Sequence, residues 1–515
     1  MSHRAIAACA AALFACGGSS KPPGTIPTGC LANADCNDPS LVCCASASYT
    51  CVAAAQCPAA SGSCPTAASI VAGGTINAPQ PPANSCSKAP KDSSLPASQV
   101  QTFKAQKVGN LLNFNVPAGT GSLTLVEQAV SAIDAVVFKG QVIENSAVPL
   151  NVIAPDGTKL YDDNTCCDPD GGDPSGQYPV FFGGGGANTL ALTMPNATLL
   201  LSSEYRDGGV GLPAGTWKMT VNDYAKECVS DPSCTDGGSP NGTYDVSVIT
   251  KPGLPTTGAL DVSLYLVSTT PGFDNTNAAQ NGAIQRFVQT LSTFYAQVGV
   301  CVRTVKVFDV PTWAQNSYGS SISADKTDPC SALDQMFTLS QPGNAMNFFL
   351  VQSITAKVGS SGQQVVGIDG TIPGPATIGG TVHSGAAVSI ADLGSIGCAG
   401  PISIKGCGPD SVAYIAAHEG GHYMGLFHTS EASGEFFDPL TDTPTCRCQT
   451  CVAATQVGSC NRDGTGTQVL PQNCRRPDGS CGGGDDLMFW IFDQSSAGHL
   501  SPQQGQVMRL NPVVQ

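Results

Sequence analysis

The chain has 515 residues, enough for about two to four domains with hydrophobic cores of their own. Only 12% of the residues are charged, while 59 Gly and 37 Pro are typical of short strands joined by turns rather than of coiled coils. The net charge of −15 repels phosphate backbones and argues against a general nucleic-acid-binding protein. The 24 cysteines indicate an oxidising compartment, and therefore an exported protein.

The N-terminus is predicted to be an export signal. Residues 1–16 contain a short start with Arg4, an apolar stretch from Ala5 to Ala15, and then Cys16, which is followed by Gly and Ser. This order resembles the lipobox of bacterial lipoproteins, which implies that Cys16 is lipidated and anchors the chain to the membrane of the cell envelope. The alternative is an ordinary secretory signal cleaved near Ala15, which leaves the protein secreted.

Three segments of low apolar content follow the signal. Residues 17–29 predict a tether, residues 30–66 a cysteine-rich knot, and residues 67–97 a semi-rigid Pro/Ser linker. The knot is defined by six closely spaced cysteines: Cys30, Cys36, Cys43, Cys44, Cys51 and Cys57. Their spacing does not choose among the many possible pairings. The simplest function for the knot is that of a spacer or a protein-contact module.

Residues 98–252 predict a β-sandwich accessory domain. Alternating polar and apolar residues between turn signals indicate short strands at 111–116, 148–153, 189–194, 216–221 and 244–248. The pattern resembles the jelly-roll domains that accompany secreted bacterial peptidases. An aspartate-rich loop at 162–173 suggests either a calcium site or a solvated turn, because no regular ligand spacing is present.

Residues 258–515 predict a mixed α+β domain. Strands are expected at 260–267, 302–310, 345–351 and 380–390, and helices at 283–298 and from about 410 to 424. The strand at 380–390 is expected to border a cleft. The cysteines of this region are even in number, which indicates that they pair with one another.

A metal-binding pattern, H-E-x-x-H-x-x-G-x-x-H, begins at His418. On a helix, His418 and His422 lie one turn apart on the same face and can bind one ion, while Glu419 lies beside that ion. Gly425 can leave the helical conformation, and a sharp turn there brings His428 back as the third ligand. Three neutral imidazoles leave a fourth position for water, as in catalytic zinc sites. The alternatives are surface histidines on a helix or a degenerate, inactive zinc site.

This pattern resembles the signature of the metzincin clan of zinc peptidases, and the text after it is most similar to the pappalysin-like (cytophagalysin) family. The resemblance implies a metzincin-like catalytic domain that binds Zn²⁺ and hydrolyses proteins or peptides. Met488, within residues 485–490, matches the Met-turn that forms an apolar base below the zinc. Trp490 stands where the family has Tyr, and an indole cannot present a phenol to an oxyanion.

A second segment, residues 438–444, matches the family's text G-D-x-V-x-D-T-P at both Asp, the Thr and the Pro, with Phe437 in place of the Gly. The resemblance implies a possible Ca²⁺ site here, with Asp438, Thr441 and Asp442 as candidate ligands.

The sequence as a whole predicts an exported zinc endopeptidase that cleaves extracellular proteins. His418, His422 and His428 hold the metal, and Glu419 takes a proton from the metal-activated water as general base. The alternative is a catalytically inactive surface binding or adhesion lipoprotein that keeps the same fold. Glu419 favours the enzyme, because a site that only binds a ligand has no use for that carboxylate.

Overall fold

The computed structural model describes two globular parts of the chain, one built on paired antiparallel sheets and one on a mainly parallel sheet. The predicted signal peptide with Cys16, the tether, most of the cysteine-rich knot and most of the aspartate-rich loop lie outside the described residues. Among the helices that the structure describes, none has both the length and the apolar character needed to cross a bilayer. Apart from Cys398 and some strand backbone, the described residues are 98–130, 151–161, 189–201, 211–222, 242–268, 273–324, 332–355, 365–394, 400–461, 466–476 and 480–515.

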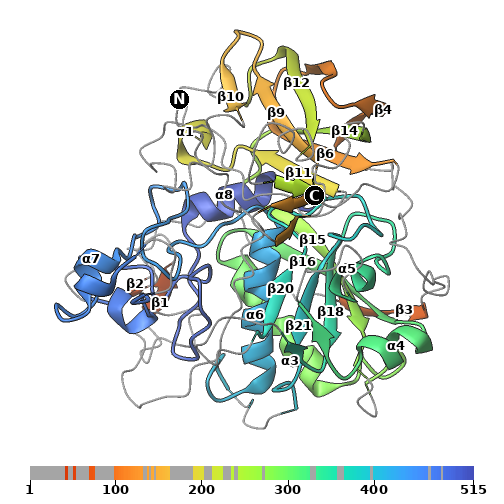
Figure 1. Ribbon diagram of the computed structural model, residues 1–515. Helices are drawn as coiled ribbons and strands as arrows, with labels where there is room; N and C mark the ends of the chain where they lie inside the picture. Colours follow the sequence, from red (N-terminus) through yellow and green to blue (C-terminus); the bar gives the residue numbers. More distant parts are fainter. Residues whose placement is uncertain are drawn as a thin grey trace.

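The first part is a sandwich of two antiparallel four-stranded sheets (Figure 1). One sheet has the order β10 (Lys159–Asp162), β9 (Ala147–Ile153), β12 (Gly215–Asp223), β5 (Leu111–Val116). The other has the order β11 (Thr189–Met194), β6 (Thr120–Ala129), β14 (Thr243–Pro252), β4 (Gln99–Lys107). All five strands predicted between residues 98 and 252 are present.

The two sheets of the sandwich share one core. On β5, Leu112, Phe114 and Val116 are buried while the residues between them are exposed, as expected for a strand with one covered face. These side chains belong to the same apolar cluster as Trp217 of β12 and Leu125 of β6. The same part of the sequence also contains a three-stranded sheet of β13 (Cys234–Asp236), β7 (Val136–Phe138) and β8 (Gln141–Ile143), and helix α1 (Thr198–Leu201). Strands β1 (Leu41–Cys44) and β2 (Thr50–Ala53) form a separate pair.

The second part is built on a six-stranded sheet. Its order is β20 (Gly367–Asp369), β21 (Ala386–Ser389), β18 (Met346–Val351), β15 (Gly258–Leu266), β16 (Val300–Asp309), β3 (Ser69–Thr75). All neighbours are parallel except β20, which pairs antiparallel with β21.

Strand β3 corrects one prediction. It lies within residues 67–97, which were expected to form a linker, yet it pairs with β16 at one edge of the sheet. The apolar text Ile70-Val71-Ala72 suits a strand, and the prolines that suggested a linker come only after residue 78.

Helices cover both faces of this sheet (Figure 1). Consecutive residues of β15 point to opposite faces of the sheet. On one face Leu264 packs in the same cluster as α3 (Gly282–Ala296) and α6 (Gly408–Tyr423). On the other face Tyr265 packs in the same cluster as α4 (Thr312–Tyr318) and α5 (Ala332–Phe337). The expected α+β class is therefore corrected to α/β for this part, because β15, α3 and β16 form a parallel crossover unit. The other elements are β17 (Ile322–Ser323), β19 (Ile354–Thr355), α7 (Cys448–Cys451), η6 (Val457–Ser459), η7 (Pro471–Cys474) and α8 (Pro502–Leu510).

The predicted strand at 380–390 is shorter in the structure, where β21 begins only at Ala386. The residues before it form a tight turn in which the Ser384 hydroxyl accepts a hydrogen bond from the Thr381 backbone and donates one to the Ile378 carbonyl. These local bonds replace the ladder bonds of a strand.

Lys251, near the end of β14, joins the sandwich to the C-terminal residues after α8. Its ammonium donates hydrogen bonds to the backbone carbonyls of Arg509, Asn511 and Val514. The side chain of Lys251 is almost fully buried. Burial, with a smaller effect from Arg509, lowers the pKa of Lys251 to about 7. In its ammonium form the side chain has a donor for each of the three carbonyls, which lie at and just beyond the C-terminal end of α8, where the helix dipole favours positive charge.

We expect Lys251→Met to lower the thermal unfolding midpoint, because it removes the ammonium donor from the buried carbonyls of Arg509 and Val514, at a cost of about 2–4 kcal/mol. Differential scanning calorimetry of the full chain measures the midpoint. Lys218→Met, at an exposed position of β12, is the matched control and should change stability by less than about 0.5 kcal/mol. Equal midpoints for the two variants would contradict this role of Lys251.

Candidate metal centre

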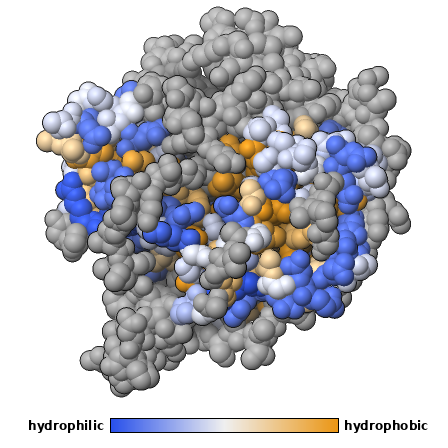
Figure 2. All heavy atoms as spheres, turned by 90° about the horizontal axis from the view of Figure 1, so that it is seen from below, coloured by the Kyte–Doolittle hydropathy of each residue, from blue (hydrophilic) through white to orange (hydrophobic). Residues whose placement is uncertain are grey.

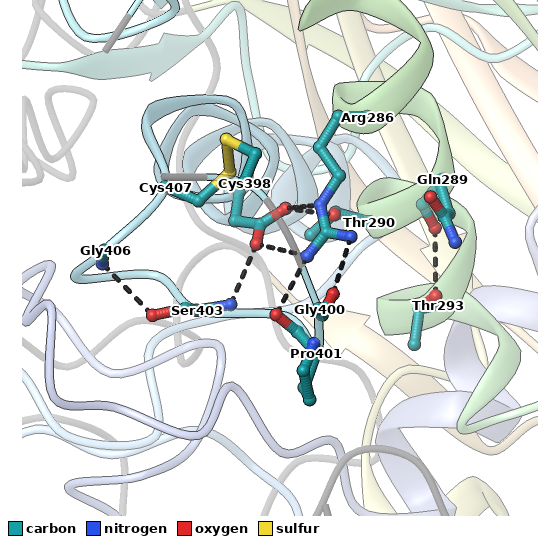
Figure 3. A network of polar contacts seen from close by, with 11 residues as sticks. Arg286, Gln289, Thr290, Thr293, Cys398, Gly400, Pro401, Ser403, Gly406 and Cys407 are labelled. Atoms are coloured by element: carbon teal, nitrogen blue, oxygen red, sulfur yellow. Dashed lines mark hydrogen bonds and ion pairs between the residues drawn. A yellow bond between two sulfur atoms is a disulfide. The ribbon is translucent and has the colours of Figure 1, made fainter. Parts of the chain in front are cut away.

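Helix α6 carries the first two histidines, and Arg286 of α3 fixes its first turn (Figure 3). The guanidinium forms two 2.7 Å hydrogen bonds to the Asp410 carboxylate, which also accepts from the Thr290 hydroxyl and the Ser403 backbone. The Asp410 side chain is fully buried, so its charge depends on these partners. The N-cap of α6 is Cys407, and Asp410, three residues later, holds α6 on α3.

The three predicted histidines converge on one point. Their Nε2 atoms lie 3.0 Å apart for His418–His422, 3.1 Å for His422–His428 and 3.2 Å for His418–His428. They form the one group of three or more candidate metal-binding side chains in the described part of the chain. Gly425, with φ of 102°, makes the turn after α6 that returns His428 to the helix. The predicted turn is therefore present, and it brings His428 to the other two histidines.

The outer nitrogen of each ring faces an acceptor. His418 Nδ1 lies 2.6 Å from the Leu487 carbonyl, and His422 Nδ1 lies 2.8 Å from the Leu426 carbonyl. A carbonyl can only accept, so each Nδ1 carries the proton and each Nε2 presents a lone pair. Burial lowers the pKa of His418 to about 3, with a smaller effect from His428, and lowers the pKa of His422 well below its usual value. The His418 and His422 rings are therefore neutral and can act as metal ligands.

The donor set fits a zinc ion. Lone pairs that face one another at these short separations repel, and a cation bound to them removes the repulsion. Tetrahedral bonds of about 2.0–2.1 Å place ligand nitrogens about 3.3 Å apart, close to the separations observed here. The histidine cluster can hold a metal ion such as zinc and is compatible with a metzincin site.

Met488 packs below the metal-binding helix. A Cβ atom on Gly421 would lie 2.5 Å from Met488 Sδ, so the thioether packs directly against this glycine and would have to shift for a larger residue. The Met488 carbonyl accepts from the backbone of Thr429, and the preceding carbonyl of Leu487 accepts from His418. Residues 487–488 therefore contact both helix α6 and the backbone that follows His428.

Glu419 is buried and lies on the side of α6 that faces β20. A Cβ atom on Gly367 of β20 would lie 2.4 Å from Glu419 Oε1, which shows that the carboxylate packs directly against this edge strand. Burial raises the pKa of the nearby Tyr295 phenol, and the charge of Glu419 raises it further. Glu419 is not part of the converging histidine group. Its role beside a metal stays a prediction.

The candidate calcium residues have structural partners around α8. Asp442 accepts from the Ser501 hydroxyl and the Gln503 backbone at the start of that helix. The Thr441 backbone donates to the Thr198 hydroxyl of the sandwich. Asp438 is buried, and its burial raises its pKa well above the usual value. Calcium binding in this loop stays a prediction.

Trp490 and the late cysteines form a separate core. The Trp490 indole donates to the Val469 carbonyl at 2.7 Å, within a cluster that contains the cysteines around α7. Seen from below, hydrophobic residues lie in one group on the same side of the molecule as α7 and in a second group nearer the centre of this face (Figure 2). Among the residues that the structure describes, disulfides join these pairs, which indicates an exported protein: Cys398–Cys407, Cys446–Cys474, Cys448–Cys460 and Cys451–Cys481.

No protein-family model matches the chain, and no curated protein matches it. Among solved structures, a family two carbohydrate esterase from Cellvibrio japonicus is similar over 51% of this chain and 68% of its own, with 12% sequence identity and a TM-score of 0.12. A similarity of that size carries no argument about fold or function. The function therefore has to be inferred from the chemistry of the site.

Proposed function

We propose that this protein is a zinc-dependent endopeptidase of the metzincin type that hydrolyses extracellular proteins. The observation that carries the proposal is the convergence of the three histidine Nε2 atoms, each with its Nδ1 bound to an acceptor, next to the buried Glu419. When bound, zinc lowers the pKa of a coordinated water towards neutrality and polarises a carbonyl. Glu419 accepts the proton of that water and returns it to the amine that leaves.

The position of β20 supports a peptide as the substrate. In the described part of the sheet, β20 is an edge strand, and Glu419 lies against it. An extended peptide can bind such an edge by adding a further strand, which brings its backbone carbonyls past the site. The disulfides support export, so the accessible substrates are extracellular proteins.

We expect the purified, disulfide-bonded full chain to cleave an unfolded protein such as reduced casein and to contain about one zinc per chain. Removing the metal with 1,10-phenanthroline should abolish cleavage, and adding Zn²⁺ after removal of the chelator should restore it. Metal analysis and gel electrophoresis measure both effects. A protein with full zinc content that cleaves no unfolded substrate would contradict the proposal and favour the inactive surface-binding alternative.

A further inference from the structure

We infer that Glu431 is a positioning residue of the metal centre that orients His428 and strengthens its bond to the ion. Glu431 Oε1 lies 3.0 Å from His428 Nδ1. The other two histidines place their Nδ1 atoms against neutral backbone carbonyls, those of Leu487 and Leu426. His428 is thus the one member of the cluster with an anionic partner on its outer nitrogen. The inference deepens the proposed function, since it concerns the same site.

The backbone holds Glu431 in place independently of any metal. Its N–H donates to the Phe436 carbonyl at 2.9 Å, and its own carbonyl accepts from Gly434 at 2.8 Å. Gly434 has φ of 63°, and a Cβ atom there would lie 2.5 Å from the backbone nitrogen of Cys448. The turn that presents Glu431 is therefore packed against the disulfide-rich core. This packing fixes the backbone of Glu431, so its carboxylate is already placed beside His428.

The charge of Glu431 is incompletely compensated by the protein. Only 22% of its side chain is exposed, and Oε2 is buried without a hydrogen-bond partner. A partly buried carboxylate that accepts from one donor is costly unless positive charge lies nearby. A dication bound to the far side of the His428 ring supplies that charge, and in return the carboxylate makes the imidazole a stronger ligand.

The expected effect is on metal affinity. In competition titrations with a chromophoric zinc chelator, Glu431→Ala in the full chain should raise the zinc dissociation constant about 10–100-fold, the usual scale for loss of such a partner. Glu431→Gln should give a smaller increase, because its amide oxygen still accepts from Nδ1 but carries no charge. Glu435→Gln, in the same turn, is the matched control and should keep the wild-type affinity.

The thermal unfolding midpoints of the proteins without zinc separate a positioning role from a merely structural one. They should be similar in wild type and Glu431→Gln, whereas a merely structural role would lower the midpoint of the variant. If Glu431→Ala fails to fold, Glu431→Gln decides: a wild-type dissociation constant in that variant would overturn the inference. Unchanged affinity in both variants, with casein cleavage intact, would overturn it and leave the proposed function standing. Altered affinity in a protein that cleaves nothing would support the inference and contradict the proposed function.

Discussion

Replacing Glu419 with alanine is expected to leave the zinc content near one per chain and to lower peptide hydrolysis by about 10²–10⁴-fold. The metal stays because the converging ligands are the three histidines, and Glu419 is not among them. Hydrolysis falls because the water then lacks a positioned base, and the leaving amine lacks a proton donor. The measurements are the steady-state rate with a fluorogenic peptide and zinc per chain by emission spectrometry.

Glu419→Gln is the sharper variant, because it keeps the volume that packs against Gly367 and removes only the basicity. It should lose activity as Glu419→Ala does while its thermal midpoint stays close to that of the wild type. Glu435→Gln, which the site does not use, should keep full activity. Cleavage by Glu419→Gln at a rate comparable to the wild type would leave a peptidase but remove Glu419 as its base.

The core of the site could be predicted from the sequence because its geometry is local. Two histidines four residues apart on a helix must share a face, and a glycine that can take a positive φ allows the turn to His428. The helix bounds, the turn at Gly425 and the convergence of the three histidines all agree with that expectation. The five predicted strands of the sandwich also appear, since alternation of polar and apolar residues marks a strand with one covered face.

What surrounds the site could not be predicted, because it depends on contacts between distant segments. The carbonyl that orients His418 belongs to Leu487, 69 residues later in the chain. The three carbonyl acceptors of Lys251 lie more than 250 residues away in the chain, and the sequence around Lys251 does not predict that this lysine is buried. Glu431 was within reach of sequence analysis, since it follows His428 by only three residues. An acidic residue on a turn is usually solvated, however, and gives no signal of its own.

His422→Ala is expected to behave differently from the Glu419 variants and to lose both zinc and activity. His422 Nε2 lies within 3.1 Å of both other Nε2 atoms, so its loss opens one side of the cluster. The two remaining histidines form an incomplete site for a catalytic zinc. Zinc content and peptide hydrolysis should therefore fall together, whereas in Glu419→Gln they separate.

Thermal unfolding with added zinc gives the decisive contrast, because an ion that binds only the folded chain stabilises it by about 2.7 kcal/mol at one hundred times its dissociation constant. Zinc should raise the midpoint of the apo wild type and of apo Glu419→Gln, but not that of His422→Ala. A zinc-dependent shift of wild-type size in His422→Ala would mean that the metal binds elsewhere. The converging histidines would then be a packed cluster rather than a metal centre, and the proposed chemistry would lose its site.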